Sequence, residues 1–373
     1  MFYLNQSVEN KANYEDYLKT VGSLSNLFSE SNVPYLYYRL AEKVFCKAFE
    51  ADDLSRSDVA IDAKKGNLGI GLKTFLLGNT KSFQKVAEFN KDRHLYDSLS
   101  SIKKVIKISE LRNERIGFAE RSHGLQSSIY HCVVRKEGKF VLYEEKMDYI
   151  NIPKIRIIKE TKSSIHFTDS QNQYSFSLSK STLLKKFTVK DISYEFNVDI
   201  FKDPLEEIQK LVKKAKLNKP QNLYKDTVFL PLYGKDKEVF ESSGLNQWNA
   251  KGRKRHINET YIPVPAIVHK LKPGFFPARD TTFNLKLTDG TLLKAKICQQ
   301  GGKALMSDPN KDLGEWILRK VLALKDGELL TYKKLEKIGI GAIRIDKISS
   351  TTYEINFSGI DSYEEWLESF QTK

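Results

Sequence analysis

The segment from Gly244 to Pro265 carries a dense cluster of positive charge. Four cations stand within five residues, at Lys251, Arg253, Lys254 and Arg255. Polar and aromatic side chains surround the cluster at Asn246, Gln247, Trp248, Asn249 and Asn258. The simplest interpretation of such a cluster is a solvated charge run, which requires a loop at the surface of the fold. Because a strand-like run, Thr260 to Leu271, follows at once, we expect a basic loop mounted on a strand.

Cations bind phosphates, whereas amides and arginine can bond the edges of bases. The basic segment is therefore a candidate arm for reading DNA. The whole chain of 373 residues has a formal net charge of +14, which suits a polyanionic partner. This charge alone does not separate DNA from RNA or from an anionic membrane surface.

Composition limits the class of protein further. The length suggests two or three domains. No apolar run reaches the roughly 18 residues of a membrane span, and the first residues do not resemble a signal peptide. Three distant cysteines without a CxxC pair indicate a reduced, cytoplasmic setting and no structural zinc.

The first 150 residues predict an α/β layer arrangement. Apolar spacing predicts a helix over 34–51, with Pro34 at its start. Alternation predicts strands over 58–62 and 67–77. Two helices are expected next, over 82–100 and on to about 120, and then a hairpin of 128–135 and 139–144 around Glu137-Gly138.

The rest of the chain is expected to contain a middle segment and a strand-rich C-terminal domain. The middle segment has short strands over 155–187, a helix over 204–217 and a polar linker over 214–225. Beyond it, Asp289-Gly290 predicts a hairpin of 282–287 and 292–299. Helices are expected from Asp312, from Thr331 and after a Ser362–Glu365 capping box, with strands over 342–348 and 352–357. The expected domains are 1–150, 151–230 and 231–373.

A second polar segment, Gln299 to Asp312, contains side chains that could bond bases. Gly301 and Gly302 would let its backbone approach a ligand closely, and glutamine or asparagine can bond adenine at two points. A plain polar loop after a hairpin is the competing interpretation. The candidate side chains are those of Gln299, Gln300, Lys303, Ser307, Asn310 and Lys311.

The order of segments over residues 235–360 resembles the B3-like DNA-reading domains of EcoRII-, BfiI- and NgoFVII-type restriction endonucleases. The matching stretches are 244–246, 258–265, 275–277, 283–290, 302–304, 313–316, Leu335 and 353–357. The resemblance implies a C-terminal pseudobarrel whose two loops, about 246–258 and 299–312, clamp the major groove of double-stranded DNA. The tract at 247–252 lacks the Trp-Gly-rich form of that family, which leaves its base contacts open.

The N-terminal half resembles PD-(D/E)xK nucleases in the order of its charged residues. In that family a helix carries a Glu, one strand an Asp and the next strand an acidic-x-Lys. Here Glu42 lies on the first helix, Asp58 and Asp62 on the first strand, and Lys73 on the second. A lysine in an otherwise apolar strand needs an acidic partner, and Asp62 is the nearest candidate.

The departure from that family is Gly71, which stands where an acid is expected. Some relatives take the missing carboxylate from the following helix, and Glu88 could fill that role. The predicted catalytic set is therefore Asp62, Lys73 and Glu88, supported by Glu42 and Asp58. Asp62 and Glu88 would hold Mg²⁺.

The sequence thus favours a Mg²⁺-dependent type II restriction endonuclease acting on double-stranded DNA, with separate reading and cutting domains. Such a division could allow cleavage to one side of an asymmetric site, which would need transient pairing of two copies to cut both strands. A cognate DNA methyltransferase would be its genetic partner. The alternatives are a DNA-binding protein without activity, an HNH-type site using His123 and His131, and an RNA-processing nuclease.

Overall fold

A computed structural model describes residues 1–55, 59–78, 81–189, 194–214 and 226–370. The chain divides into two compact units. Unit 1 consists of Met1–Arg56, Ala60–Ile116 and Leu125–Lys219, and unit 2 consists of Ser57–Val59, Gly117–Gly124 and Pro220–Lys373. Among the described residues, no helix is both long enough and apolar enough to cross a membrane.

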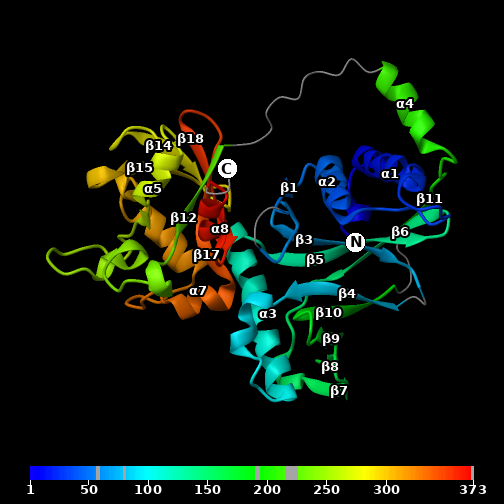
Figure 1. The fold of residues 1–373 in the computed structure, drawn as a ribbon, viewed down its shortest axis with the longest axis horizontal. Helices are drawn as coiled ribbons and strands as arrows, with labels where there is room; N and C mark the ends of the chain where they lie inside the picture. The colour runs from blue at the N-terminus through cyan, green and yellow to red at the C-terminus, as the bar shows by residue number, and fades with distance from the viewer. Residues whose placement is uncertain (56–58, 79–80, 190–193, 215–225, 371–373) are drawn as a thin grey trace. The chain divides into compact units, whose positions relative to one another are not determined.

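A mixed six-stranded sheet is the centre of unit 1 (Figure 1). Its third and fourth strands are parallel, while the other neighbours are antiparallel. In spatial order the strands are β1 (Asp52–Asp53), β2 (Ala63–Lys65), β3 (Leu68–Leu76), β5 (Ser127–Lys136), β6 (Lys139–Lys146) and β11 (Tyr194–Asn197).

Helices α1 (Val8–Ser23) and α2 (Tyr38–Phe49) cover one face of this sheet. The apolar residues of α2 recur at helical spacing, so that Phe45 and Phe49 are buried against Ile70 and Leu72 of β3. Burial of these side chains is the main stabilising term for this half of unit 1. Helix α4 (Pro204–Lys214) also belongs to unit 1.

A second, antiparallel sheet of five strands completes unit 1. Helix α3 (Ser101–His123) packs on it through Val105, Ile108 and Leu111, which join a core with residues of β8 and β9. In spatial order the strands are β4 (Lys81–Glu88), β10 (Thr182–Thr188), β9 (Gln173–Ser177), β8 (Ser164–Thr168) and β7 (Arg156–Glu160).

Unit 2 is built on a seven-stranded sheet that curls until its two edge strands, β12 and β13, contact each other. The result is a nearly closed, barrel-like sheet. In spatial order the strands are β12 (Asp226–Pro231), β17 (Ile340–Lys347), β18 (Thr352–Gly359), β14 (Thr282–Lys286), β15 (Leu292–Cys298), β16 (Ala304–Ser307) and β13 (Ile262–Pro263).

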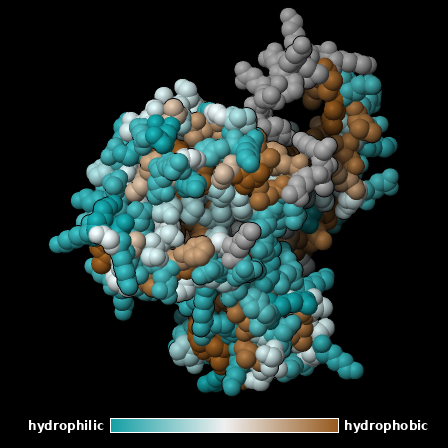
Figure 2. Space-filling view, turned by 60° about the vertical axis from the view of Figure 1, so that its left-hand side comes forward, coloured by the Kyte–Doolittle hydropathy of each residue, from teal (hydrophilic) through white to brown (hydrophobic). Residues whose placement is uncertain are grey.

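The core of unit 2 fills the inside of this barrel-like sheet. Strand side chains alternate, so that Phe283, Leu285, Ala295 and Ile297 point inward while their neighbours point out. Hydrophilic side chains predominate on the molecular face drawn in Figure 2. The helices of unit 2 are α5 (Ala266–Leu271), α6 (Asp312–Gly314), the π-helix η8 (Glu315–Val321), α7 (Tyr332–Ile338) and α8 (Ser362–Glu368).

Several predicted elements are confirmed. The helix over 34–51 is α2, the strand over 67–77 is β3, and both expected hairpins form, with Gly138 and Gly290 at positive φ. Thr331 caps α7 by accepting a hydrogen bond from the backbone N–H of Lys334, and Gly339 ends that helix in the left-handed conformation.

Four local predictions are wrong. Residues 82–88 belong to strand β4 and not to a helix, because pairing with β10 outweighs their helical propensity. Residues 59–62 are not in a strand, and Asp58 lies outside the described residues. The run 260–271 is a strand only over Ile262–Pro263, since prolines interrupt it and α5 follows. Ser362 lies inside α8, whose N-cap is Asp361, so no capping box forms.

Gly314 should be intolerant of any side chain. A Cβ atom there would lie 1.8 Å from the backbone oxygen of Asn258. We expect Gly314→Ala to destabilise unit 2 by about 2 kcal/mol or more, because backbone cannot move aside as a side chain can. Thermal unfolding would measure this loss. The control is Gly78→Ala, where no described atom beyond the adjacent residues lies within 4 Å. Equal melting temperatures for the two variants would contradict the expectation.

Candidate functional site

The basic loop, defined here as residues 246–258, is closed at its base by one backbone carbonyl. The oxygen of Gly244 accepts hydrogen bonds from the Thr260 hydroxyl at 3.0 Å and from the Tyr261 N–H at 3.2 Å. Gly244 has φ of +58°, a conformation that favours glycine. These bonds fix the two ends of the loop against each other beside β13.

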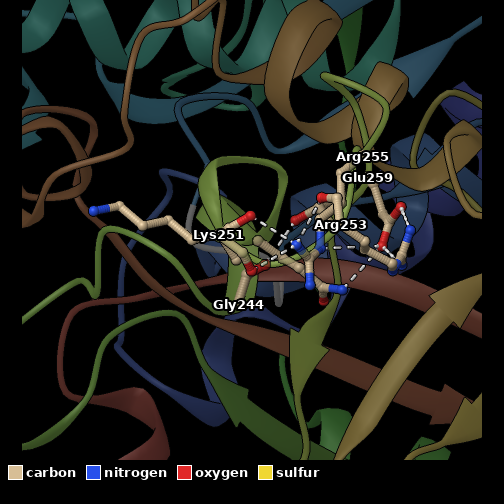
Figure 3. Close-up of polar contacts among 8 residues, drawn as sticks. Gly244, Lys251, Arg253, Arg255 and Glu259 are labelled. Carbon is tan, nitrogen blue, oxygen red and sulfur yellow. Dashed lines mark hydrogen bonds and ion pairs between the residues drawn. The ribbon is translucent and has the colours of Figure 1, made fainter.

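A buried carboxylate, that of Glu259, organises the interior of the basic loop (Figure 3). It accepts hydrogen bonds from both terminal nitrogens of Arg253, one of them at 3.2 Å, and from the side-chain amide nitrogen of Gln247 at 3.1 Å. The Nε of Arg255 lies 3.7 Å from the same carboxylate. A buried carboxylate is stable only when donors surround it. Here the donors are side chains of the basic loop, so the same bonds also hold the loop in place.

Arg255 and Arg319 fix the backbone of the loop. The Nη1 of Arg255 donates to the carbonyls of Ala250 at 2.7 Å, Lys251 and Arg253. Arg319, on the π-helix η8, donates to the Asn258 side chain at 2.8 Å and to the Ile257 carbonyl at 3.0 Å. Both guanidinium groups therefore stabilise the conformation of the loop.

Two cations of the loop are exposed and have no polar partner in the described part of the chain. They are Lys251 and Lys254. Figure 3 shows the Lys251 side chain extending away from the group around Glu259. Their ammonium groups keep their full charge available for an anion.

The structure gives structural roles to several residues that were predicted to contact DNA. Asn246 is fully buried, and its amide group bonds the backbone of Phe240 and Leu330. Ser307 is also buried, where its hydroxyl bonds Pro309 and Leu313. Trp248 packs against the core of unit 2. In this conformation the side chains of Asn246 and Ser307 are unavailable to a base, because each is occupied inside the fold, whereas Trp248 is only partly buried.

The predicted second arm, 299–312, is two loops and not one. Strand β16 divides it, and β16 pairs antiparallel with β13. The loop 299–303 therefore adjoins the end of β13, where the Lys303 carbonyl accepts the Val264 N–H at 2.8 Å. Residues 308–311 follow the other end of β16, which in the antiparallel register lies towards the start of β13, where the basic loop ends. The basic loop and the loop 299–303 thus flank the β13–β16 pair from opposite ends.

Five polar side chains of these two short loops are exposed. Among the described residues none of these five has a polar side-chain partner, whereas Asp308 pairs with Lys296 at 3.2 Å. They are available to a ligand, in contrast to Ser307 between them. The exposed side chains are those of Gln299, Gln300, Lys303, Asn310 and Lys311.

In unit 1 the structure brings Asp62 and Lys73 together. The Lys73 ammonium lies 3.7 Å from the Asp62 carboxylate, as the sequence predicted. The carboxylate also accepts the Leu72 N–H at 2.7 Å, which fixes it against β3. Both side chains keep about a quarter of their surface exposed, Lys73 22% and Asp62 29%, so that a solute can reach them.

Glu42 of α2 adds a second carboxylate to this group. Burial raises the pKa of Glu42, and the negative charge of Asp62 raises it further, against the lowering effect of Arg39 at 3.4 Å. Two carboxylates that repel each other in this way would be stabilised by a shared cation.

Among the described residues, no hydrogen bond or ion pair joins Glu88 to this group. It lies on β4, in the second sheet, and its carboxylate bonds Lys85 and Asn90. The hydrogen bond from Lys85 lowers the pKa of Glu88. Gly71 itself is closely packed, since a Cβ there would meet Met147 at 2.6 Å and Tyr130 at 3.0 Å. A side chain at this position would therefore need its neighbours to move.

His131 is enclosed in the core. Its Nδ1 lies 2.7 Å from the Glu144 carboxylate and its Nε2 lies 2.9 Å from the Tyr14 hydroxyl. Glu144 also binds the N–H groups of Phe2 and Tyr3, and these bonds and His131 lower its pKa despite burial. Since both ring nitrogens are occupied, this arrangement gives no support to a histidine-metal site.

Sequence reasoning missed Glu259, Arg319 and a buried pair in unit 1. The sequence did contain a signal for Glu259, because it is the single acidic residue in the basic stretch 244–265. The pair is Lys185 of β10 with Glu145 of β6, and Tyr143 donates to the same carboxylate. Residue pairing places Glu145 and Tyr143 on the sheet face that carries Lys73. No local pattern signals a contact between strands 40 residues apart in sequence.

The fit to a divalent cation rests on Glu42 and Asp62. Among the described residues, no group of three or more histidine, cysteine or acidic side chains is arranged to hold a metal. Mg²⁺ is commonly held by one or two carboxylates, with waters and phosphate oxygens as its other ligands. Glu42 and Asp62 are the two carboxylates of this group that could belong to such a site.

Comparison with known proteins finds a similarity in the C-terminal region. Residues 221–349 match the family model of the NgoFVII C-terminal B3-like DNA-binding domain, a restriction-enzyme domain. This confirms the B3-like resemblance of the C-terminal region. No curated protein matches the chain.

The raised pKa of Glu42 predicts that ionising this side chain lowers the stability of the folded chain, in a pH-dependent way. The folded chain binds a proton at Glu42 more readily than the unfolded chain does, so stability decreases as pH rises from the ordinary glutamate pKa towards the raised one. We expect Glu42→Gln to melt at a higher temperature than the parent at neutral pH. Below pH of about 4 this advantage should disappear.

The matched control is Glu88→Gln, because the pKa of Glu88 is lowered and not raised. This variant should melt slightly lower than the parent at neutral pH, with a small effect since the side chain is 44% exposed. Melting curves recorded from pH 4 to 8 would test both signs. A lower melting temperature for Glu42→Gln at neutral pH would contradict the argument.

Proposed function

We propose that this chain is a restriction endonuclease, in which unit 2 reads a site in double-stranded DNA and unit 1 hydrolyses a phosphodiester bond with Mg²⁺. The match to a restriction-enzyme DNA-binding domain supports the first part. The observation that carries the second part is the group of Asp62, Lys73 and Glu42, with an ion pair of 3.7 Å and a carboxylate whose pKa is raised.

Unit 2 offers the charges and exposed donors that a duplex requires. Lys251 and Lys254 on the basic loop would hold phosphates on one side of the β13–β16 pair. Lys303, Gln299 and Gln300 would act from the other side. This arrangement is a clamp with two arms, of which the second is the loop 299–303 alone.

In unit 1, Asp62 and Glu42 would hold the ion, and Lys73 would serve the attacking water. When bound, Mg²⁺ supplies a Lewis acid beside the phosphate. The Lys73 ammonium, held by Asp62, would orient the attacking water and would stabilise the charge that develops on the phosphate. In-line attack would leave a 5′-phosphate and a 3′-hydroxyl.

This placement favours Glu42 over Glu88 as the second carboxylate. The charge of Asp62 acts on Glu42, whereas Glu88 is bonded to its own neighbours. Asp58 stays a supporting candidate from the sequence alone. A cut in both strands would require transient pairing of two copies, and a methyltransferase of the same specificity would protect the host DNA.

A DNA-binding protein without catalytic activity is the second candidate function. The observation that favours it is Gly71, which stands where related nucleases carry an acid and where a side chain would require Met147 and Tyr130 to move. Binding to a duplex would then be the whole function of unit 2, and Asp62 with Lys73 would be a structural pair.

Cleavage of a plasmid in the presence of Mg²⁺ separates the two functions. We expect the parent to cut, and Asp62→Ala or Lys73→Ala to lower the rate by about a hundredfold or more while binding is kept, because each removes a group that acts on the water or the phosphate. The matched control is Lys65→Ala, since the Lys65 ammonium donates to the Glu50 carbonyl and lies outside the proposed catalytic group. Glu88→Gln tests the predicted role of Glu88 directly.

Intact supercoiled plasmid with the parent protein, across divalent metals and site-rich substrates, would leave the DNA-binding function as the explanation. Full activity of both Asp62→Ala and Lys73→Ala would place catalysis elsewhere in the chain.

A further inference from the structure

Arg253 differs from the other cations of the basic loop because it is both exposed and fixed. Its side chain is 58% exposed, yet two of its N–H groups are held by the buried carboxylate of Glu259. A guanidinium has five N–H groups, so three remain for a ligand. Arg255 is different, since it is 16% exposed and donates to three carbonyls of the loop.

Charge separates Arg253 from the lysines beside it. Glu259 neutralises Arg253, which weakens its attraction for a phosphate but holds its donors in one orientation. The ammonium groups of Lys251 and Lys254 have no polar partner among the described residues, so these side chains keep their charge and their freedom to rotate. The lysines suit a phosphate backbone, whereas a fixed fork of donors suits a pair of fixed acceptors.

The amide side chains of the loop are occupied, which limits the bases that it can read. Adenine is read at two points by an amide that both donates and accepts. Here Asn246 and Asn258 bond the backbone or Arg319, and Gln247 donates to Glu259. Asn249 donates to the Glu241 carbonyl at 3.0 Å. Arg253 combines an exposed guanidinium fork with a fixed orientation, which suits it to bond a base edge at two points.

We propose that Arg253 reads guanine in the DNA site, donating to its N7 and O6 atoms, and that Glu259 is the positioning residue that fixes Arg253 for this contact. The inference rests on the proposed DNA-reading function of unit 2. In the major groove, guanine presents these two acceptors side by side, and they match a guanidinium fork.

The test begins with the full-length parent protein and a randomised duplex library, without divalent metal so that no strand is cut. The selected site and every single base-pair change of it are then titrated by fluorescence anisotropy, at two or more salt concentrations. The variants are Arg253→Ala and Glu259→Gln, with Lys254→Ala as the matched control. Melting temperatures show whether each variant is folded. If Glu259→Gln does not fold, the result for Arg253→Ala decides whether Arg253 reads guanine.

Arg253→Ala should lose discrimination at one G·C pair, by about tenfold to a hundredfold, and keep it at the other positions. Glu259→Gln should lose discrimination at the same pair while its affinity for non-specific duplex is kept or increased, because a negative charge has been removed. A purely structural role of Glu259 would lower both. Lys254→Ala should weaken all duplexes alike and reduce the salt dependence by about one ion.

A selected site without a G·C pair would overturn the inference, as would an Arg253→Ala variant that weakens every duplex equally. Unchanged discrimination in a folded Glu259→Gln variant would overturn the positioning role. Each of these outcomes leaves the parent's sequence preference intact. Absence of any preference in the parent would instead overturn the proposed function of unit 2.

Discussion

The carboxylate of Glu259 is the contact on which the shape of the basic loop depends. Positive charges placed close together repel one another, and a loop that carries four of them within five residues has little reason to adopt one conformation. Glu259 offsets two of these charges and holds the ends of Gln247 and Arg253 at one point. With the carbonyl of Gly244 closing the base, the loop becomes a fixed feature of unit 2.

The candidate site of unit 1 also contains an ion pair, Asp62 with Lys73, but the environment of this pair differs from that of Glu259. Glu259 is buried and satisfied, whereas Asp62 and Lys73 are partly exposed and share their surroundings with Glu42, whose pKa is raised. A raised pKa means that the ionised group is not fully compensated. Incomplete compensation is typical of sites that bind ions or substrates, and complete compensation is typical of groups that maintain a fold.

The sequence predicted those features that are local. Helical spacing located α2, glycine turns located both hairpins, and the alternation of β3 led to the pairing of Lys73 with Asp62. It did not predict features decided by distant contacts. Strand β4 forms because β10 lies beside it, and β16 divides the expected second arm because it pairs with β13. Likewise, Asn246 and Ser307 are buried by contacts with distant residues, and nothing in the sequence distinguishes them from exposed polar residues.

In unit 2, side chains whose polar groups are already bonded within the protein fix the loop, whereas side chains with free polar groups can bond DNA. Side chains that bond the protein itself, such as Asn258 and Arg255, set the position of the backbone and have little left for a ligand. Free lysines have charge to offer but no fixed direction. Arg253 combines a fixed direction with exposed donors, because its carboxylate partner is buried while it is not. Specificity needs both properties in one side chain, since a mobile donor adapts to any acceptor and a buried one meets none.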